Sequence, residues 1–291
     1  VFSASALGTM ELLFHLKEKR SLPGISDQLG KRVRTNSESL IGVRIPGCSE
    51  DLSKGVAIGS GVYIDEHTHI EAVRYPGGSD TMGMLATILT GGHPGPSRVL
   101  LWIKNVAWSS LRHPIRTFRV FQPFGWARES VILLCMQALE GHIDMAWKRA
   151  WFWPFRKFLV SRGQKMPTFI PRANEFAQKF ASLTGGTAMS MIPEILFDIP
   201  GTAHCLGGCA IADSPRNGVV DYRNRLFGYK NMYICDGSVV AANLGVNPSL
   251  TITALTERAM SFIQPASETE WNEAAENPVN DVRAPETRMR A

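Results

Sequence analysis

The side chains best suited to chemistry, His204 and Asn247, stand in a glycine-rich block from residue 201 to residue 263. An imidazole can accept a proton or hydrogen-bond a hydroxyl group, and an amide supplies a second directed hydrogen bond. Together the two groups could hold one substrate oxygen. Alone, His204 would be an ordinary loop histidine and Asn247 an ordinary helix cap, so their interpretation depends on the elements around them.

Two of those elements are predicted to end or begin beside the block's polar residues. The run NMYICDG reads as a strand that ends in Asp236-Gly237, and open α/β folds bind nucleotide cofactors at the carboxyl ends of strands. A glycine there lets the backbone approach a ligand. Asn247-Pro248 precede an apolar helix, SLTITALTERAMSFI, with Asn as cap and Pro as first residue. The N-terminus of such a helix would stabilise an anion.

The rest of the chain predicts a mixed α/β (α+β) fold with several strands in a row. Strand-like runs occupy 39–45, 56–64, 68–75 and 130–137, and residues 1–5 read as the end of a buried strand. We expect helices at 80–90, at 172–183, and after Thr9 as an N-cap. The strands in sequence point to a sheet covered by helices.

Cations and aromatic rings are concentrated in one part of a chain whose net charge is +5. Residues 98–165 hold twelve Lys/Arg against three Asp/Glu and six of the seven Trp, most densely at 147–158. This composition suits a membrane surface, and also a core whose charges form a solvated rim. Stacking of single-stranded nucleic acid is a third reading. No nucleic-acid-binding motif accompanies the patch, so we expect no nucleic-acid partner.

The composition excludes several other classes of protein. With 44% hydrophobic residues the chain can bury a core, and its apolar runs are shorter than the ~20 residues of a membrane helix. Five cysteines favour a reducing compartment over a disulfide framework. Cys205 and Cys209 with one histidine lack a second ligand pair, and His67 and His69 read as an exposed strand pair, so we expect no metal.

The chain starts at Val1 without an initiator Met or signal peptide, so we expect a piece of a longer protein, cytoplasmic or held at a membrane surface. Residues 264–291 lack aliphatic periodicity and are expected to be a disordered tail.

In order and spacing, these segments closely resemble the C-terminal signature of the glucose–methanol–choline (GMC) family of FAD-dependent oxidoreductases, in its cholesterol oxidase branch. The matching residues are His204 before Leu206-Gly207-Gly208, then Asp236-Gly237-Ser238, Gly245-Val246-Asn247-Pro248, and Thr251-Ile252-Thr253-Ala254-Leu255 followed by Glu257-Arg258. The chain departs from the pattern at Cys205, where the family commonly has Pro.

The resemblance implies oxidation of the hydroxyl of a sterol or other bulky hydrophobic alcohol, with hydride passing to flavin N5 and His204 and Asn247 holding the oxygen. Glu71, on the predicted strand HIEAVRYP, maps to an acid that serves steroid isomerisation. The helix after Asn247 would face the reduced, anionic flavin, and the loop 30–38 would lie near it. The residues implied to bind FAD are Gly8, Thr9, Asn36, Asp236, Gly237, Asn247, Pro248 and Ser249.

The resemblance also divides the chain. Residues 1–45 and 200–263 would belong to a split, Rossmann-like FAD domain, and 46–199 to a substrate-binding domain built on a sheet with helices. The family's GxGxxG fingerprint is absent and is expected before Val1. Two alternatives stay open: a GMC dehydrogenase of long-chain or terpenoid alcohols with an acceptor other than oxygen, and a membrane-surface binding fragment without turnover.

Overall fold

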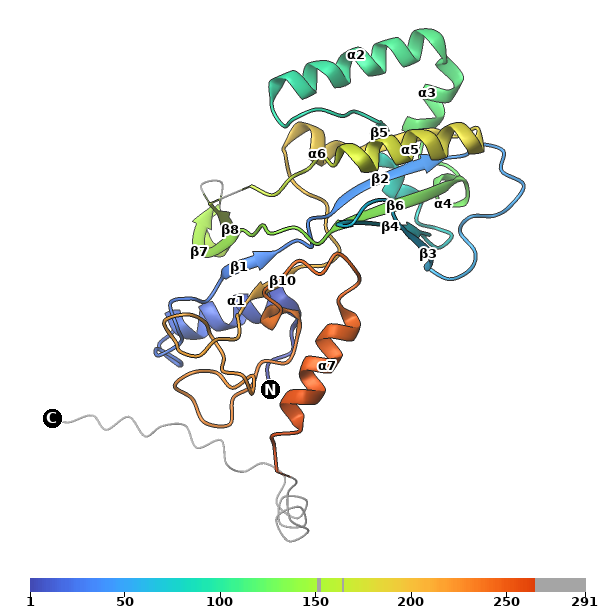
Figure 1. The fold of residues 1–291 in the computed structure, drawn as a ribbon. Helices are drawn as coiled ribbons and strands as arrows, with labels where there is room; N and C mark the ends of the chain where they lie inside the picture. The colour runs from blue at the N-terminus through green and yellow to red at the C-terminus, as the bar shows by residue number, and fades with distance from the viewer. Residues whose placement is uncertain (151–152, 164, 265–291) are drawn as a thin grey trace, which may run out of the picture.

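The computed structural model describes residues 1–150, 153–163 and 165–264, which form an upper sheet-and-helix part and a lower part around the N-terminus (Figure 1). The expected tail, and Trp151 and Phe152 of the basic aromatic stretch, lie outside the described residues. The helices are α1 (Ser5–Glu18), η1 (Asp80–Leu85), α2 (Pro96–Arg112), α3 (Pro114–Phe121), α4 (Trp126–Glu129), α5 (Pro171–Thr184), α6 (Ile192–Leu196), η2 (Gly237–Val239) and α7 (Ser249–Met260). The strands are β1 (Lys31–Arg34), β2 (Ser39–Arg44), β3 (Ile58–Tyr63), β4 (Thr68–Val73), β5 (Ala86–Ile88), β6 (Ser130–Gln137), β7 (Asp144–Ala150), β8 (Trp153–Arg162), β9 (Thr187–Met191) and β10 (Leu206–Gly208).

A six-stranded antiparallel sheet with the order β3-β4-β6-β2-β9-β5 forms the centre of the upper part. The strands predicted at 39–45, 56–64, 68–75 and 130–137 are confirmed as β2, β3, β4 and β6. Alternate residues of these strands point to opposite faces, so each face has its own set of side chains.

One face of the sheet is covered by α5, which Figure 1 shows lying along β2. Ile41, Val43 and Leu133 pack there against Ala173 and Ala177 of α5. The small residues of α5 allow the helix to approach the sheet closely, which confirms the amphipathic helix expected at 172–183.

The opposite face carries Glu71. Register pairs Glu71 with Leu134, and Leu134 with Leu40, so these three side chains stand in one row across β4, β6 and β2. Farther along this face, Val120 of α3 and Trp126 of α4 form a small core with Met189. The face is therefore acidic near one end and apolar beyond it.

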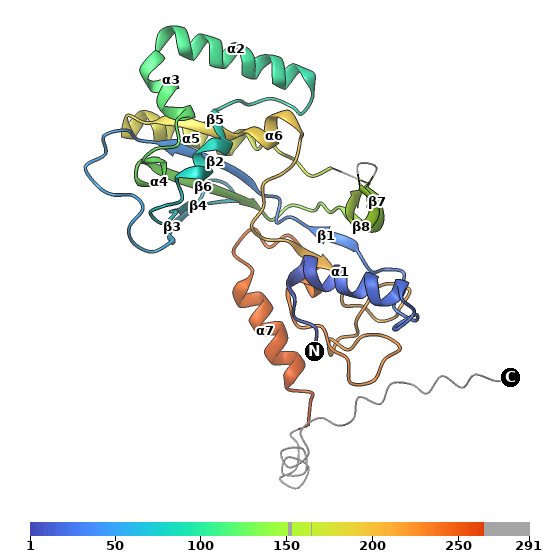
Figure 2. The same cartoon turned by 180° about the vertical axis from the view of Figure 1, so that it is seen from behind.

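The lower part is built from α1, the β1–β10 pair, α7 and long connections, as the reverse view also shows (Figure 2). Its core includes Met10 and Leu13 of α1, Val33 of β1, Leu206 of β10 and Ile234. At Gly207, φ is +72° and a Cβ would lie 2.2 Å from the carbonyl oxygen of Arg32, so only glycine fits this crossing.

Three local predictions are wrong. The segment 80–90 is the short η1 followed by β5, because Ala86–Ile88 pair with β9 instead of continuing a helix. Thr9 lies inside α1 and not at its cap, because its hydroxyl is held by Asp236. Residues 1–5 and NMYICDG make only isolated bridges, Phe2 with Ile234 and Tyr233 with Arg225, and form no strand.

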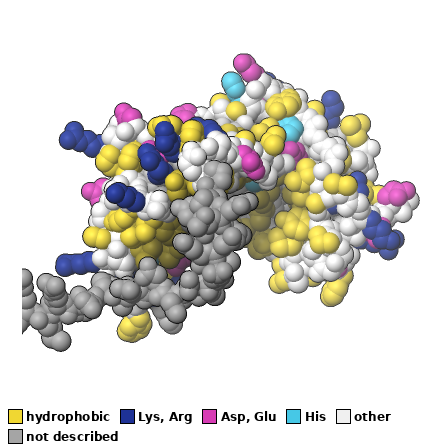
Figure 3. Space-filling view, turned by 90° about the horizontal axis from the view of Figure 1, so that it is seen from below, with side chains coloured by type: hydrophobic (Ala, Val, Ile, Leu, Met, Phe, Trp, Pro, Cys, Tyr) yellow, Lys and Arg dark blue, Asp and Glu magenta, His cyan; other side chains and the backbone are white. Residues whose placement is uncertain are grey.

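The basic aromatic stretch contains two strands that the sequence did not predict. β7 and β8 form a separate hairpin in which Trp147 stacks on Phe14 of α1 with ring centroids 6.4 Å apart. Seen from below, the left half of the molecule shows hydrophobic side chains among Lys and Arg side chains (Figure 3). Within the described ranges, no helix has the length and apolar character needed to cross a membrane.

Candidate active site

His204 is held by a buried acid. Its Nδ1 hydrogen-bonds Oε1 of Glu38, which is fully buried, and the other oxygen of Glu38 accepts from the backbone N–H of Ala203 at 2.7 Å. The backbone N–H of His204 donates to Oγ1 of Thr202 at 3.0 Å. Ring and backbone are therefore both fixed, and Nε2 is the nitrogen that can meet a substrate.

Asn247 is held by a second acid. Its Nδ2 donates to both oxygens of Glu71, at 2.9 and 3.1 Å, while its Oδ1 is buried without a hydrogen-bond partner. The imidazole of His69 lies beside Glu71, with Nδ1 at 3.6 Å from Oε1. An orphaned acceptor of this kind is costly unless a ligand satisfies it, so Oδ1 is suited to accept a hydrogen bond from a hydroxyl group.

Asn36 joins the two halves of the site. This fully buried residue donates from Nδ2 to Glu38 at 3.3 Å and to the carbonyl oxygen of Val246 at 3.0 Å. Its Oδ1 accepts from the N–H of Gly245 at 2.9 Å. Because Val246 directly precedes Asn247, the structure links the predicted pair into one constellation that runs from His204 to Glu71.

The predicted cofactor residues at the N-terminal end of the chain meet Asp236. Oδ2 of Asp236 accepts from the Thr9 hydroxyl at 2.5 Å, and Oδ1 accepts from the N–H of Ser238 at 2.9 Å. Gly8 lies beside Thr9 on α1, and Gly237 is buried, with Leu206 3.1 Å from the position of a Cβ. These hydrogen bonds hold the Asp236-Gly237 turn against α1. Both oxygens of the Asp236 carboxylate are used in them.

The predicted helix is confirmed as α7, with Pro248 buried and Ser249 exposed. The predicted cap is wrong: Pro248 is the N-cap and Ser249 the first helical residue, because the Asn247 side chain is bonded to Glu71 instead. No side chain caps its N-terminus. The first N–H groups of α7 remain available to an anion next to Asn247.

Another buried acid, Glu194 of α6, is hydrogen-bonded to the segments on either side of the His204–Glu38 pair. It is 1% exposed, and burial raises its pKa to about 7 although donors from Leu40, Gly201 and Ser39 oppose the shift. Leu40 follows Glu38 by two residues, and Gly201 precedes His204 by three. Glu194 therefore ties together the two segments that carry the His204–Glu38 pair.

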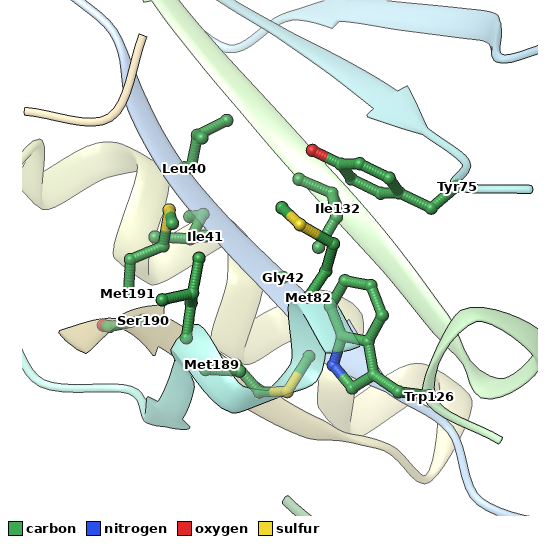
Figure 4. Close-up of a pocket in the computed structure, with 12 residues that line it drawn as sticks. Leu40, Ile41, Gly42, Tyr75, Met82, Trp126, Ile132, Met189, Ser190 and Met191 are labelled. Carbon is green, nitrogen blue, oxygen red and sulfur yellow. The ribbon is translucent and has the colours of Figure 1, made fainter. Parts of the chain in front are cut away.

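An apolar cavity of about 40 Å³ opens on the same sheet face as Glu71. Figure 4 shows Tyr75, Met82 and Trp126 facing Leu40 and Ile132 across it. The row Glu71–Leu134–Leu40 connects the polar site with this cavity. Such a surface favours a hydrophobic molecule that carries one polar group.

Sequence reasoning missed Glu38 as the partner of His204, and it missed Glu194. Glu38 stands in the loop 30–38 that was expected near the cofactor, but it is sequentially remote from His204, so spacing carries no signal of the pair. Glu38 directly precedes the apolar strand β2, and Glu194 stands among the apolar residues of α6, so an acid beside apolar residues is the hint that the sequence offers.

Nothing in the described part of the chain gathers three metal-ligating His, Cys, Asp or Glu residues. Cys205 and Cys209 are free, and burial raises the pKa of the Cys209 thiol to about 12. Such a thiol stays protonated and is a poor nucleophile.

Comparison with known proteins assigns the class. The family model for GMC oxidoreductases matches residues 135–256. Over these residues the chain is similar to the C-terminal part of GMC oxidoreductases. Its expected mixed α/β fold is confirmed by the helices and the antiparallel sheet of the structure.

Across nearly its whole length the chain is similar to cholesterol oxidases. It is 55% identical over 282 residues to the cholesterol oxidase of Acinetobacter baumannii, covering 97% of this chain and 50% of that protein. It is 40% identical over 276 residues to the cholesterol oxidase of Mycobacterium tuberculosis, covering 93% of this chain and 47% of that protein. The chain thus spans about half the length of these relatives. A solved formate oxidase of Aspergillus oryzae matches with a TM-score of 0.48 at 13% identity, over 90% of this chain and 53% of that one.

Proposed function

We propose that this chain forms the substrate-holding half of an FAD-dependent alcohol oxidoreductase that acts on a sterol or another bulky hydrophobic alcohol. The observation that carries the proposal is the constellation His204–Glu38 and Asn247–Glu71, joined through Asn36 beside an apolar cavity. Similarity to two cholesterol oxidases favours a sterol as substrate.

In this proposal each side chain has one task. Nε2 of His204 accepts the hydroxyl proton or hydrogen-bonds the oxygen, and Glu38 at Nδ1 fixes the ring orientation and stabilises the ring when it gains a proton. Since Nδ2 of Asn247 is already bound to Glu71, its orphaned Oδ1 accepts the hydrogen of the same hydroxyl while a protonated Nε2 donates to the hydroxyl oxygen. The hydrogen passes to Nε2 only when that nitrogen is unprotonated. FAD, when bound, supplies the hydride acceptor.

The residues present fit an FAD site. The uncapped N-terminus of α7, beginning after Pro248, offers N–H groups and a positive dipole end to an anionic ring. The half-buried Gly8 on α1 allows close approach of a cofactor. The buried Gly237 packs instead on Leu206 and Ile252, and Thr9 is bonded to Asp236. A Pro248→Gly variant should lower the flavin potential and weaken sulfite adduct formation; equal values in variant and wild type would remove α7 from the flavin.

Glu71 is proposed to act on the oxidised steroid as the acid or base of double-bond isomerisation. It is 7% exposed and oriented by Asn247, and it faces the row that leads to the cavity. The test is product analysis of a Glu71→Gln variant, which should release the unisomerised ketone if oxidation persists.

The cavity is too small to enclose a sterol in the conformation that the structure shows. Ligand sites for molecules of this size enclose several hundred Å³, roughly 300–1,000, whereas this cavity holds about 40 Å³. A sterol would therefore have to displace part of the wall that η1 and α4 form, or lie along the open sheet face.

The decisive experiment follows flavin reduction in the full-length protein under anaerobic conditions. Cholesterol, a long-chain primary alcohol and a terpenoid alcohol are compared at equal concentration. Rapid bleaching by the sterol alone supports the proposal, bleaching by the other alcohols favours the dehydrogenase alternative, and no bleaching by any alcohol would contradict alcohol oxidation.

We also propose a membrane contact through 147–158, with fewer free cations than the sequence suggests. Arg156 and Lys157 form ion pairs with Glu11 and Glu18 of α1, which leaves Lys148 and Arg149 as the cations facing solvent in β7. Phe155 is 88% exposed. Replacement of Phe155 by Ser should weaken binding to anionic vesicles if this hairpin inserts.

A further inference from the structure

Helix α2 packs against the protein through its polar side. Arg98, Trp102, Asn105 and Ser109 follow each other at spacings of four, three and four residues, so they share one face of the helix. Nε1 of Trp102 donates to the Thr87 hydroxyl at 2.8 Å, and this contact anchors α2 to β5.

The anchoring of this polar face continues along the helix. Nη1 of Arg98, which is 2% exposed, donates to the Thr168 hydroxyl at 3.0 Å and to the carbonyl oxygen of Glu194 at 3.2 Å. Ser109 and Thr117 of α3 are hydrogen-bonded at 2.6 Å. These contacts fix which side of α2 faces inward.

The opposite face of α2 is apolar and turned to solvent. Leu100, Ile103, Ala107 and Leu111 are spaced by three, four and four residues, and Leu100, Ile103 and Leu111 are 68%, 53% and 81% exposed. A surface helix normally buries its apolar stripe and solvates its polar one. Here the arrangement is reversed, so the stripe is available to an apolar partner.

The surroundings of this stripe carry positive charge. Residues 81–128 contain no Asp or Glu, while Lys104, Arg112, Arg116 and Arg119 are exposed on α2 and α3. The guanidinium of Arg112 lies over the Trp108 ring, 4.5 Å from its centroid. Both ribbon views place α2 at the outer end of the molecule, away from α7 and the N-terminus (Figures 1 and 2).

We propose that the outer face of α2, defined by Leu100, Ile103, Ala107 and Leu111, docks on an anionic lipid membrane. Apolar residues bordered by exposed cations match the acyl region and the charged headgroups of such a surface, and Trp108 suits the boundary between them. A second copy of this chain would instead bring like charges together. The docking does not depend on the oxidation proposed above.

The test is co-sedimentation of the full-length protein with vesicles of phosphatidylcholine alone or mixed with phosphatidylglycerol. An apolar-face variant, Leu100→Gln with Ile103→Gln and Leu111→Gln, should bind the mixed vesicles about 10²-fold more weakly. A charge variant, Lys104→Gln with Arg112→Gln and Arg116→Gln, should lose about fivefold per residue. The control, Leu183→Gln with Val56→Gln, changes two side chains that are 77% and 71% exposed elsewhere, and should bind as wild type.

Salt and oligomeric state complete the test. Raising the salt from about 0.1 to 1 M should weaken wild-type binding, because the screening length shortens from ~10 to ~3 Å. Equal binding by wild type and the apolar-face variant overturns the proposal. So does loss of binding only in Phe155→Ser, which assigns the contact to β8. The proposal is also overturned if wild type sediments as a dimer, the apolar-face variant sediments as a monomer, and neither binds vesicles. That result would assign the outer face of α2 to contact with a second copy of the chain.

Discussion

Glu194 is expected to make the stability of the protein fall as pH rises from 5 to 8. Burial raises its pKa from the ordinary value of 4.5 to about 7. Between these values the unfolded chain has an ionised carboxylate while the folded chain keeps the proton, so the folded state binds more protons and each step up in pH favours unfolding. Above pH 7 the loss is complete and amounts to about 3 kcal/mol.

A Glu194→Gln variant isolates this effect. The amide keeps an oxygen for the N–H groups of Leu40 and Gly201, which donate to Oε1 at 3.1 and 3.4 Å, and the Ser39 hydroxyl can turn to accept from the new NH₂ group. The variant has no proton to lose. Relative to it, wild type should become less stable by about 2.5 kcal/mol between pH 5 and pH 8.

The measurement is urea unfolding of both proteins at several pH values and constant ionic strength, followed by intrinsic fluorescence. Glu175→Gln on α5 is the control, since the Glu175 side chain is 67% exposed and its removal should leave the pH dependence unchanged. A difference between wild type and Glu194→Gln that stays constant from pH 5 to pH 8 would refute the reasoning, because no buried carboxyl group would then be titrating.

Three shorter predictions concern the site and its support. His204→Ala should slow flavin reduction by ~10²–10⁴-fold in stopped-flow experiments while FAD stays bound, and unchanged kinetics would remove His204 from the chemistry. Gly207→Ala should destabilise the protein by about 3 kcal/mol in urea unfolding, since its Cβ would lie 2.2 Å from a carbonyl oxygen, whereas Gly47→Ala, also at positive φ but with no atom within 4 Å, should cost only about 1 kcal/mol. Maleimide labelling followed by mass spectrometry should modify Cys48 before Cys209, whose thiol is fully buried; labelling of both at one rate would contradict the burial.

The parts of the fold that the sequence predicted are those in which a local pattern and the tertiary packing agree. The six residues of β2 and the eight of β6 are mostly apolar, and α5 has a clear apolar stripe. The pattern of hydrophobic residues was therefore sufficient to predict these three elements. The failure at 80–90 has the opposite cause, because a helix-like composition there is overridden by pairing of β5 with β9. β7 and β8 were missed because interleaved cations and rings conceal the alternation of a strand.

The candidate site divides in the same way. His204 and Asn247 stand in short motifs that can be read locally, and the structure brings them into one constellation. Their acidic partners, Glu38 and Glu71, are separated from them by 166 and 176 positions. A pairing over such a distance depends on how the sheet meets the 201–247 loops, and one sequence holds no periodic signal of that contact.

The short segment from Asn36 to Ser39 determines how the two halves of the site meet. Asn36 and Ser37 both have positive φ, +55° and +48°, a conformation that costs non-glycine residues of order 1 kcal/mol or more each. The cost is offset by buried hydrogen bonds to Glu38, Val246 and Gly245, and this local turn directs the Glu38 side chain toward His204. Since Asn36 touches both the partner of His204 and the residue before Asn247, any shift of this turn moves both oxygen-binding groups together. The proposed binding of one hydroxyl by both His204 and Asn247 requires that their relative position be fixed. This position is set by a segment whose own polar groups are hydrogen-bonded within the protein.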